Sequence, residues 1–515
     1  MDELHTIGGK LITVDYVIIG VYMVGVLYIG MYFAKYIHSS GDFFLAGRAL
    51  PFWAIGMSVV VSDIGAIDLI TGAGAAYDRG IAQANFDWIG SVPALLVAAF
   101  IFVPYYWRAG VYTLPEFLGR RYNSATRWVH ALVLLIFMLA TVSIMLWTSA
   151  VFLREVLGWH EINAIWVTAL IVGCYAISGG LAAVVMTDVL QLVVMFVGTG
   201  ALLALGMWEV GGWDGMVEKV LTQPGETKEY FRLLVEHRQG TEYPWPGMVF
   251  SLGIIMSTAY FVGNQAVMQR ALGARSEWDA KAGMITAGLF KMAIPVLVFL
   301  PGMAARGLFP DLEASDAAIP TLIDRLMPPG LKGLMFAAFF AALMSSVDSY
   351  LNSCVTIFTG DVYRPIHKRL TGNEMSEKLG LTLGRSLTAF VLVAAAIYAP
   401  NFSESETLYD VIQTLLSLFQ GPTLAILLLG IFWRGATAWG GFAGLIIGVA
   451  LTSVLNILGD AVFISDNPYL FVSFWSFWVS LAVTIAVSLV TKKKTAEELE
   501  GLVYGSVLLK PTKGN

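Results

Sequence analysis

Polar and ionisable residues interrupt two long apolar segments at their centres, and their types suit the binding of a small polar solute. At the centre of the first segment, 52–77, are Ser62, Asp63, Gly65 and Asp68. The second, 246–270, has a similar central group: Ser257, Thr258, Gly263, Asn264 and Gln265. Paired interruptions in two halves of a membrane chain are typical of a transporter's binding site, because broken backbone lines a cavity there. Two glycine-kinked packing helices are the alternative.

Oxygen donors suited to a sodium ion occur beside the first interruption and on a distant segment of small residues. The carbonyls of Val61 and Ile64 flank the break, where helical partners are lost. Ser345 and Ser346 supply hydroxyls, with Ala342 one turn earlier. Carbonyls freed by broken helices, together with hydroxyls, bind ions inside membranes. The alternative is that the serines pack helices or bond to their own preceding turn.

Two further carboxylates, Asp188 and Asp348, lie within apolar segments. A carboxylate at membrane depth costs at least about 2.5 kcal/mol, so it usually has a function. In the alternative interpretation, Asp188 faces a cytoplasmic vestibule and Asp348 pairs with a basic neighbour.

The segments that carry these residues are membrane spans. Of 515 residues, 57% are hydrophobic and 13% are charged, about half the charged share of a soluble domain. Runs of about 20 apolar residues, enough to cross a bilayer, recur along the chain. They predict about thirteen transmembrane helices, at 13–36, 52–77, 81–106, 126–155, 161–178, 181–207, 246–270, 280–305, 331–359, 381–400, 407–433, 437–458 and 468–491.

The distribution of basic residues predicts the orientation, because cytoplasmic connections are rich in Lys and Arg. An outside N-terminus and a cytoplasmic C-terminus place the basic connections and the tail on one side. These residues are Arg108, Arg120, Arg121, Arg270, Arg275, Lys281, Arg364, Lys368, Arg369, Lys378, Arg434 and Lys492 to Lys494.

Composition and spacing exclude several classes of function. The net charge of −6 argues against nucleic acid as a partner. The six histidines never occur at zinc-ligand spacing, and no nucleophile–base pair or phosphate-binding loop indicates an enzyme. We therefore expect no cofactor, no metal other than sodium and no obligate protein partner. The start of the chain has no removable signal peptide pattern.

Seven long stretches resemble the solute:sodium symporter family, and within it the sodium/sugar branch. They cover most of the chain, in family order: DFFLAGRALPFWAIGMSV at 42–59, YTLPEFLGRRYN at 112–123, SGGLAAVVMTDVLQ at 178–191, NQAVMQRALGA at 264–274, FKMAIPVLVFLPG at 290–302, FAALMSSVDSYLNSCVTIFTGDVY at 340–363 and GPTLAILLLGIFW at 421–433.

The resemblance implies an all-α, leucine-transporter-like integral membrane fold in a single transporter domain, 1–515. Its expected parts are an extra N-terminal helix, two inverted five-helix repeats, C-terminal helices and a cytoplasmic tail. Their respective ranges are 13–36, 52–207, 246–433, 437–491 and 492–515.

The resemblance also implies ion sites. The family's sodium site matches the carbonyls of Val61, Ile64 and Ala342 and the hydroxyls of Ser345 and Ser346. A second ion site in the family matches Asp188, Asp348 and Ser349, although position 348 more often holds Ser or Thr in the sugar branch.

At matching depth, the resemblance places a solute pocket lined by carboxylate, amide and ammonium groups that suit hydroxyl pairs. Its candidates are Asp63, Asp68, Asp87, Ser257, Lys291 and Gln413, with Phe86 and Tyr260 as gates. The sugar branch more often has amides at positions 63 and 68, so the added charge leaves the solute open. Lys291 as an interhelical salt bridge and Gln413 as a packing amide are the alternatives.

We therefore expect a sodium-coupled symporter of the plasma (inner) membrane that imports a sugar or polyol by alternating access. The alternatives are a sodium symporter for an amino acid, carboxylate or cationic osmolyte, and a non-transporting solute sensor. No segment resembles the soluble output domain that a sensor normally needs.

Overall fold

The computed structural model describes residues 11–224, 227–238, 241–403, 408–463 and 467–508. Within these ranges the chain forms helices and no strand. Two isolated β-bridges join Leu50 to Ala274 and Val235 to Pro244.

The helices follow one another with short connections. The first half contains α1 (Thr13–Ala34), α2 (Ser40–Leu45), α3 (Phe52–Asp63), α4 (Ala73–Arg79), α5 (Val92–Val97), α6 (Val103–Ala109), α7 (Leu114–Arg121), α8 (Ser124–Leu157), α9 (Glu161–Val210) and α10 (Gly212–Leu221). The second half contains α11 (Ser257–Gly263), α12 (Gln265–Leu272), α13 (Glu277–Lys291), α14 (Leu300–Leu308), α15 (Ala318–Leu326), α16 (Leu331–Ile357), α17 (Arg364–Thr371), α18 (Glu377–Tyr398), α19 (Leu408–Phe432), α20 (Ala438–Val462), α21 (Tyr469–Val490) and α22 (Tyr504–Leu508).

Wider π-helical turns and tighter 3₁₀ turns join or extend several of these helices. The π-helical turns are η2 (Asp68–Gly72), η4 (Phe86–Ser91), η5 (Ala98–Phe102), η7 (Gly247–Met256), η8 (Pro295–Phe299) and η10 (Phe358–Tyr363). The 3₁₀ turns are η1 (Ala46–Arg48), η3 (Gly80–Ala84), η6 (Lys228–Phe231), η9 (Ser315–Ala317) and η11 (Ala399–Phe402).

Ten helices of the described chain are long and apolar enough to cross a membrane, and two bent pairs raise the number to 12. The sequence predicts about thirteen spans. The difference lies at 161–178, where Glu161–Cys174 is a shorter apolar helix. Gly180 interrupts α9 just after it, with a φ of 52° that side-chain-bearing residues rarely adopt.

Both segments that were expected to be interrupted are bent. The first turns by 65° between α3 and Asp68–Ala84, and the second by 56° between Gly247–Gly263 and α12. The backbone of Ile64 leaves the helical region, with φ −94° and ψ 84°. At the second bend, Asn264 is extended and its side chain accepts a hydrogen bond from the amide of Ala266, which caps α12. A polar cap therefore marks the second break, and a non-helical residue just before Gly65 marks the first.

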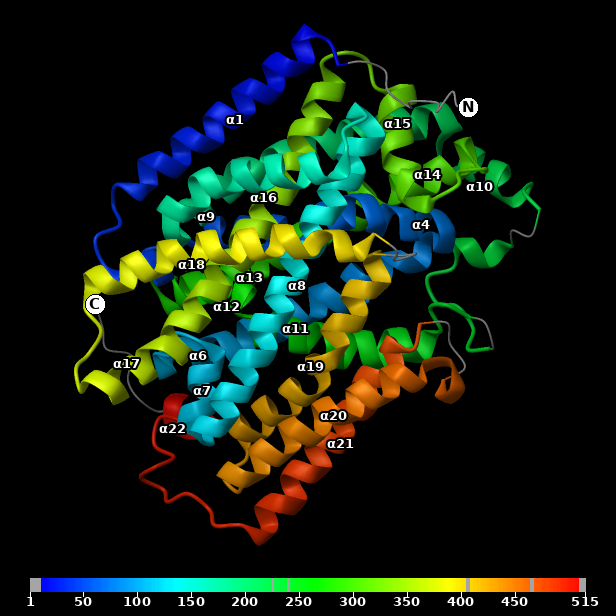
Figure 1. Cartoon of the computed structure of the whole chain (residues 1–515). Coiled ribbons are helices and arrows are strands. Elements are labelled where there is room, and N and C mark those ends of the chain that lie inside the picture. The colour runs from blue at the N-terminus through cyan, green and yellow to red at the C-terminus, as the bar shows by residue number, and fades with distance from the viewer. Residues whose placement is uncertain (1–10, 225–226, 239–240, 404–407, 464–466, 509–515) are drawn as a thin grey trace.

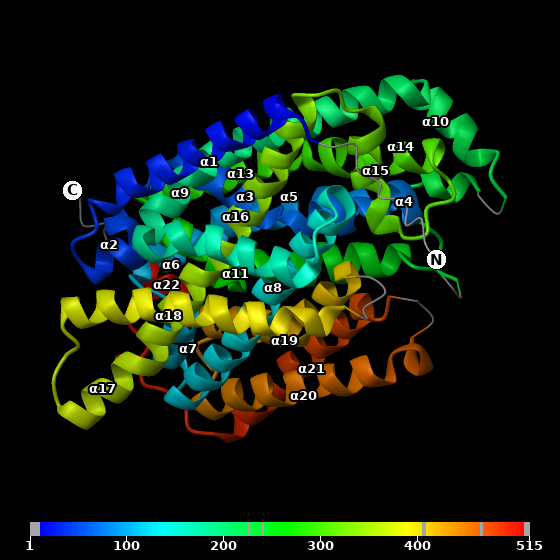
Figure 2. The same ribbon diagram turned by 45° about the horizontal axis from the view of Figure 1, so that its top comes forward.

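The two bent pairs lie near the centre of the molecule, surrounded by long helices. α16 packs against α9, α8, α1 and α3, and α13 packs along α3. On the other side α19, α20 and α21 pack together. Figure 1 shows α19 beside α11, and in Figure 2 α1, α18 and α20 run along the outside of the molecule. The buried face of α16 thus meets the break that follows α3.

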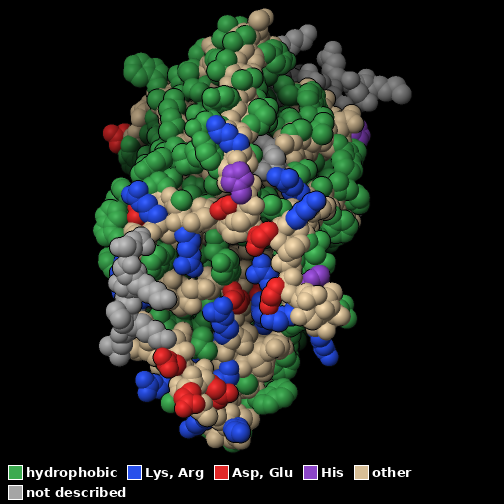
Figure 3. Space-filling model, turned by 90° about the vertical axis from the view of Figure 1, so that its left-hand side faces the viewer, with side chains coloured by type: hydrophobic (Ala, Val, Ile, Leu, Met, Phe, Trp, Pro, Cys, Tyr) green, Lys and Arg blue, Asp and Glu red, His purple; other side chains and the backbone are tan. Residues whose placement is uncertain are grey.

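One end of the molecule is rich in charged side chains. Figure 3 shows the end where α17 and α22 lie, and Lys and Arg side chains gather there between apolar flanks. Two arginines that the sequence places in cytoplasmic connections, Arg121 and Arg270, have buried side chains. Arg121 donates to carbonyls at the end of α19, those of Gly430, Trp433 and Ala436, and Arg270 is 1% exposed inside α12. For Arg270 the connection assignment was wrong, because a buried carboxylate balances its charge.

Candidate functional site

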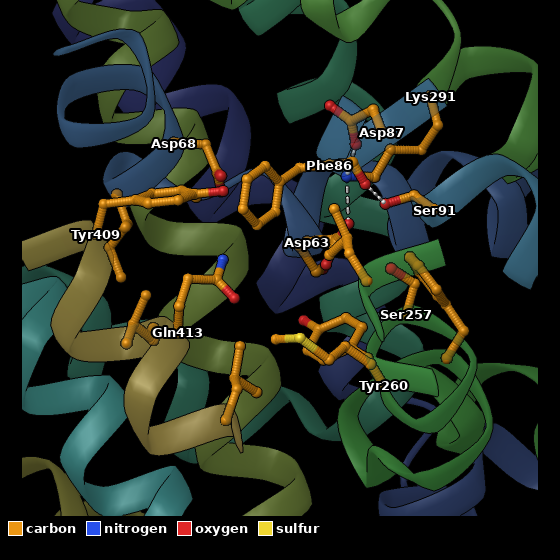
Figure 4. A pocket seen from close by; sticks show the side chains of 18 of the residues that line it. Asp63, Asp68, Phe86, Asp87, Ser91, Ser257, Tyr260, Lys291, Tyr409 and Gln413 are labelled. Atoms are coloured by element: carbon orange, nitrogen blue, oxygen red, sulfur yellow. Dashed lines mark hydrogen bonds and ion pairs between the residues drawn. The ribbon is translucent and has the colours of Figure 1, made fainter. Parts of the chain in front are cut away.

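A single cavity lies between the bent pairs and α19. It is lined by all eight residues that the sequence analysis assigned to the solute pocket and its gates: Asp63, Asp68, Phe86, Asp87, Ser257, Tyr260, Lys291 and Gln413. The free space, counted out to its open mouth, is about 830 Å³. Residues more than 300 positions apart in the sequence therefore line the same pocket (Figure 4).

Lys291, at the end of α13, is the cation of this cavity. Its ammonium lies 2.7 Å from a carboxylate oxygen of Asp87 and also pairs with Asp63. The three side chains are at most 10% exposed. Because removing charges from water is costly, such a group stays charged only when it is paired. Lys291 therefore connects α3, η4 and α13 through two ion pairs.

Asp68 lies on the opposite side of the cavity from Lys291 in Figure 4. It begins the π-helical turn η2, and Asp87 likewise lies in the π-helical turn η4. Such turns are frequent at functional sites, because an extra residue redirects the side chains around it. In the described part of the chain, the carboxylate of Asp68 has neither a hydrogen bond nor an ion pair with another side chain.

One face of α19 supplies the remaining wall, and sequence reasoning found only one of its polar residues. Tyr409, Gln413 and Gln420 line the cavity together with Ile412 and Leu416. The family resemblance identified Gln413, and helical spacing from Gln413 would have pointed to Tyr409 and Gln420 on the same face. The rings of Phe86 and Tyr409 meet edge to face, with centroids 5.3 Å apart.

A charged network, also missed by the sequence analysis, covers the cavity on the side of α4. Arg79 forms two hydrogen bonds with Asp410, of 2.7 and 3.2 Å, and donates to Tyr243 at 2.7 Å. It also pairs with Glu242. Burial raises the pKa of Glu242 from its ordinary value, although the charge of Arg79 acts in the opposite direction. Phe86 lies beneath this network, in contact with Tyr243.

Asp316, in the connection η9, is a second acid at this end. Burial, and then the negative charges of Asp78 and Asp410, raise its pKa to about 7. Its Oδ1 atom has no hydrogen-bond partner within the described ranges.

This environment predicts a pH-dependent stability. The folded protein keeps the Asp316 proton between about pH 4 and 7, where the unfolded chain loses it. Stability from this group therefore falls as pH rises through that window, by about 1–2 kcal/mol after allowance for partial exposure. We expect the Tm of Asp316→Asn in detergent, relative to the unsubstituted protein, to increase from pH 5 to pH 8. A constant difference would contradict the raised pKa.

Backbone and hydroxyl oxygens gather where α16 meets the break after α3. Ser345 donates to the carbonyls of Val61 at 2.8 Å and of Ala342 at 2.9 Å. Ser346 donates to the carbonyls of Ser62 and Ala342, both at 3.0 Å. A Cβ atom on Gly65 would lie 2.6 Å from the hydroxyl of Ser346. The expected oxygens of Val61, Ala342, Ser345 and Ser346 thus lie together, next to the non-helical residue Ile64.

Asp188 lies in a polar cluster that adjoins these oxygens through Ser62 and Ser349. It does not face an open vestibule, since it is 0% exposed. It accepts hydrogen bonds from Ser58, Ser62 and Arg270, the last at 3.2 Å. Arg270 also donates to Ser349, which bonds in turn to Asp348 at 3.2 Å. The structure therefore places a guanidinium among the residues expected to form the second ion site.

Tyrosines close the cavity on the side of α12. The hydroxyls of Tyr260 and Tyr350 lie 3.1 Å apart, and the amide of Asn264 donates to Tyr350 at 3.3 Å. Tyr260 therefore lies between the cavity and the second bend.

The fold has a solved counterpart of the same architecture. A Na⁺-coupled sialic acid symporter, in a substrate-bound outward-open state, superimposes with a TM-score of 0.81. The alignment covers 94% of this chain and 100% of the other, at 21% sequence identity. At that identity the likeness shows the fold alone.

Sequence comparison shows the family. Sodium/glucose cotransporter 1 of Oryctolagus cuniculus is 32% identical over 529 residues, which cover 93% of this chain and 79% of the relative. The sodium/myo-inositol cotransporter of Homo sapiens is 31% identical over 552 residues, which cover 96% and 76%. Residues 43–448 match the model of the sodium:solute symporter family. The chain, with its two bent helix pairs around a polar cavity, belongs to the sodium:solute symporter family.

Proposed function

We propose that this protein is a sodium-coupled symporter that carries a sugar or polyol across the membrane by alternating access. The observation that carries the proposal is the polar cavity between two broken spans, with an oxygen cluster directly beside it. Members of the family are transporters, not enzymes, and use sodium as the coupling ion. The similar proteins named above carry glucose and myo-inositol.

The sodium ion is proposed to bind at the oxygen cluster of Val61, Ile64, Ala342, Ser345 and Ser346. Three backbone carbonyls and two hydroxyls make a neutral set of hard donors, which suits a monovalent ion that must also leave. The ion would join α3 to α16 one residue from Asp63, which lines the solute cavity. Sodium binding would therefore organise the pocket before the solute enters.

The second ion site, at Asp188, Asp348 and Ser349, is proposed to hold no sodium in this arrangement. Arg270 is hydrogen-bonded to both Asp188 and Ser349, and a second cation there would meet its charge. We therefore expect one sodium per cycle. The sodium dependence of uptake should then have a Hill coefficient of about 1, and a value near 2 would contradict it.

The arrangement in the membrane is part of the proposal. Inverted five-helix repeats at 52–207 and 246–433 are supported by the position of the bent pair at the start of each. Lys and Arg gather at the end that holds α17 and α22 (Figure 3), which supports a cytoplasmic C-terminus and an outside N-terminus. The plasma (inner) membrane is the proposed location, and no obligate protein partner is proposed.

Uptake into proteoliposomes tests the function. We expect an inward sodium gradient to drive accumulation of a labelled sugar or polyol, and no accumulation without it. The panel includes hexoses, inositols, amino acids and carboxylates. Sodium-driven uptake of an amino acid or carboxylate alone would overturn the solute class, and no gradient-driven uptake would overturn the function.

Replacing Gly65 by alanine tests the sodium site without removing a ligand. The added Cβ would lie 2.6 Å from the Ser346 hydroxyl, which must rotate away from its present direction. We expect the sodium concentration for half-maximal uptake to rise about tenfold, equivalent to about 1.4 kcal/mol. Gly20→Ala, which meets nothing within 4 Å, is the control. An unchanged sodium dependence in Gly65→Ala would contradict the proposed position.

A further inference from the structure

The solute cavity contains more negative than positive charge. Three carboxylates line it, those of Asp63, Asp68 and Asp87, and Lys291 is the cation among its described lining residues. With all four groups ionised the formal charge is −2, and one sodium at the adjacent oxygen cluster changes it to −1. A neutral sugar leaves that charge uncompensated in a site that closes away from water, which is costly.

The residual charge is located at Asp68. Lys291 is already engaged by Asp63 and Asp87, and Figure 4 shows Asp68 on the other side of the cavity. Among the described residues, Asp68 has no hydrogen-bonded or ion-paired side chain. Its carboxylate accepts a hydrogen bond from the backbone of Gly65, which leaves further acceptor positions on its two oxygens for a ligand. A carboxylate pairs most strongly with a cationic donor, since charge-assisted hydrogen bonds are about twice as strong as neutral ones.

A second, independent feature indicates that the ligand also brings hydrogen-bond donors to the wall that α19 forms. Gln420 on α19 is 2% exposed, and its Oε1 atom has no partner within the described ranges. Buried acceptors are normally satisfied, and this one lines the cavity. Gln413, two turns earlier, directs its amide toward the same space in Figure 4. Two amides suit several hydroxyls, which a simple alkylammonium ion lacks.

The aromatic rings beside Asp68 fit the same ligand. Phe86 and Tyr409 both line the cavity, and Tyr409 lies next to Asp68 in Figure 4. An aromatic face accommodates the C–H surface of a sugar ring and attracts a nearby ammonium group. The pocket therefore presents the carboxylate of Asp68, two aromatic rings and two amides to the same ligand.

We propose that the solute is an amino sugar, a polyhydroxylated ring bearing a protonated amine, whose ammonium group pairs with Asp68 while its hydroxyls bond to Gln413 and Gln420. The inference rests on the proposed sodium symport and narrows its solute class. One sodium and one such solute neutralise the pocket.

Uptake by the unsubstituted protein in proteoliposomes, driven by an inward sodium gradient, tests this directly. The probes are labelled D-glucosamine, D-glucose and N-acetyl-D-glucosamine, which share a ring but differ in the charge of the substituent. We expect glucosamine to have an uptake efficiency at least tenfold above both neutral sugars. Its transport should also move one more positive charge per solute than that of glucose, measured as current.

The variant Asp68→Asn then tests whether the ammonium group of the solute pairs with Asp68. The preference for glucosamine over glucose should fall at least tenfold in this variant, and should be unchanged in Asp316→Asn, a matched substitution outside the pocket. Asp68→Glu, which keeps the charge, should retain the preference. If Asp68→Asn does not fold, the ranking of the three sugars by the unsubstituted protein still decides the proposal.

The outcomes are distinguishable. Sodium-driven uptake of glucose equal to or better than that of glucosamine would overturn the amino sugar and leave sodium symport intact. An unchanged preference in Asp68→Asn would overturn the pairing with Asp68. Sodium-driven uptake of neither glucosamine nor any member of the earlier panel would overturn the proposed function, and this inference with it.

Discussion

Replacing both Ser345 and Ser346 by alanine is expected to abolish sodium-driven uptake while the protein remains folded. The two hydroxyls would be side-chain ligands of the ion, and each also bonds to carbonyls of α3 and α16 at 2.8–3.0 Å. A hydrogen bond to a charged group contributes about 1.5–3 kcal/mol. If each lost ligand contributes similarly, two losses raise the sodium concentration for half-maximal uptake at least a hundredfold.

The double substitution is expected to reduce the stability of the fold less than it reduces sodium binding. Each serine is a small buried residue whose neutral hydrogen bond contributes about 0.5–1.5 kcal/mol. The measurement is uptake over a series of sodium concentrations, together with thermal unfolding in detergent. Ser143→Ala is the matched control, because this buried serine bonds to the Leu139 carbonyl of its own helix. Uptake that keeps its sodium dependence in the double variant would contradict the site.

Lys291→Met is expected to reduce stability strongly and to stop uptake. The substitution leaves Asp63 and Asp87 facing one another without the ammonium that now pairs with both. Removing one partner of a buried ion pair typically costs about 3–5 kcal/mol, because the remaining charge is unpaired. The loss should be visible as a lower Tm in detergent and as absent uptake in proteoliposomes.

Further substitutions separate the structural role of Lys291 from its role in transport. Adding Asp63→Asn and Asp87→Asn to Lys291→Met removes the unpaired charges, so most of the stability should return without uptake. Lys368→Met, which breaks an exposed pair with Glu374, should change stability by less than about 1 kcal/mol. A Lys291→Met protein as stable as the unsubstituted one would show that these carboxylates carry no charge.

The sequence by itself determines the class of this protein and the places where its helices break. A run of about 20 apolar residues forms a helix in a bilayer, because no water is present there and the backbone N–H and C=O groups must hydrogen-bond to one another. The breaks at Ile64 and Asn264 are likewise local, because glycine and short polar residues offer the backbone alternative bonds. Both bends were therefore expected from sequence and are present.

Motif resemblance, rather than periodicity, identified most of the candidate site. Composition alone shows that Asp63, Asp87 and Lys291 are costly in a membrane, but not that they meet. Helical spacing along α19 would have added Gln420, because it lies on the same helical face as Gln413. The short length of the helix Glu161–Cys174 is harder to predict from sequence, since an apolar run does not show where a regular helix within it ends.

Which charges neutralise one another depends on the packing of distant helices. Arg270 reads as a loop residue in sequence, yet it is buried against Asp188, 82 residues away. Arg79 pairs with Asp410 across 331 residues. The two ion pairs of Lys291 leave Asp68 in the solute cavity without a side-chain partner among the described residues. Local sequence patterns do not predict such pairs, because the pairs depend on how distant helices pack. The same packing determines the net charge of the cavity that the solute must neutralise.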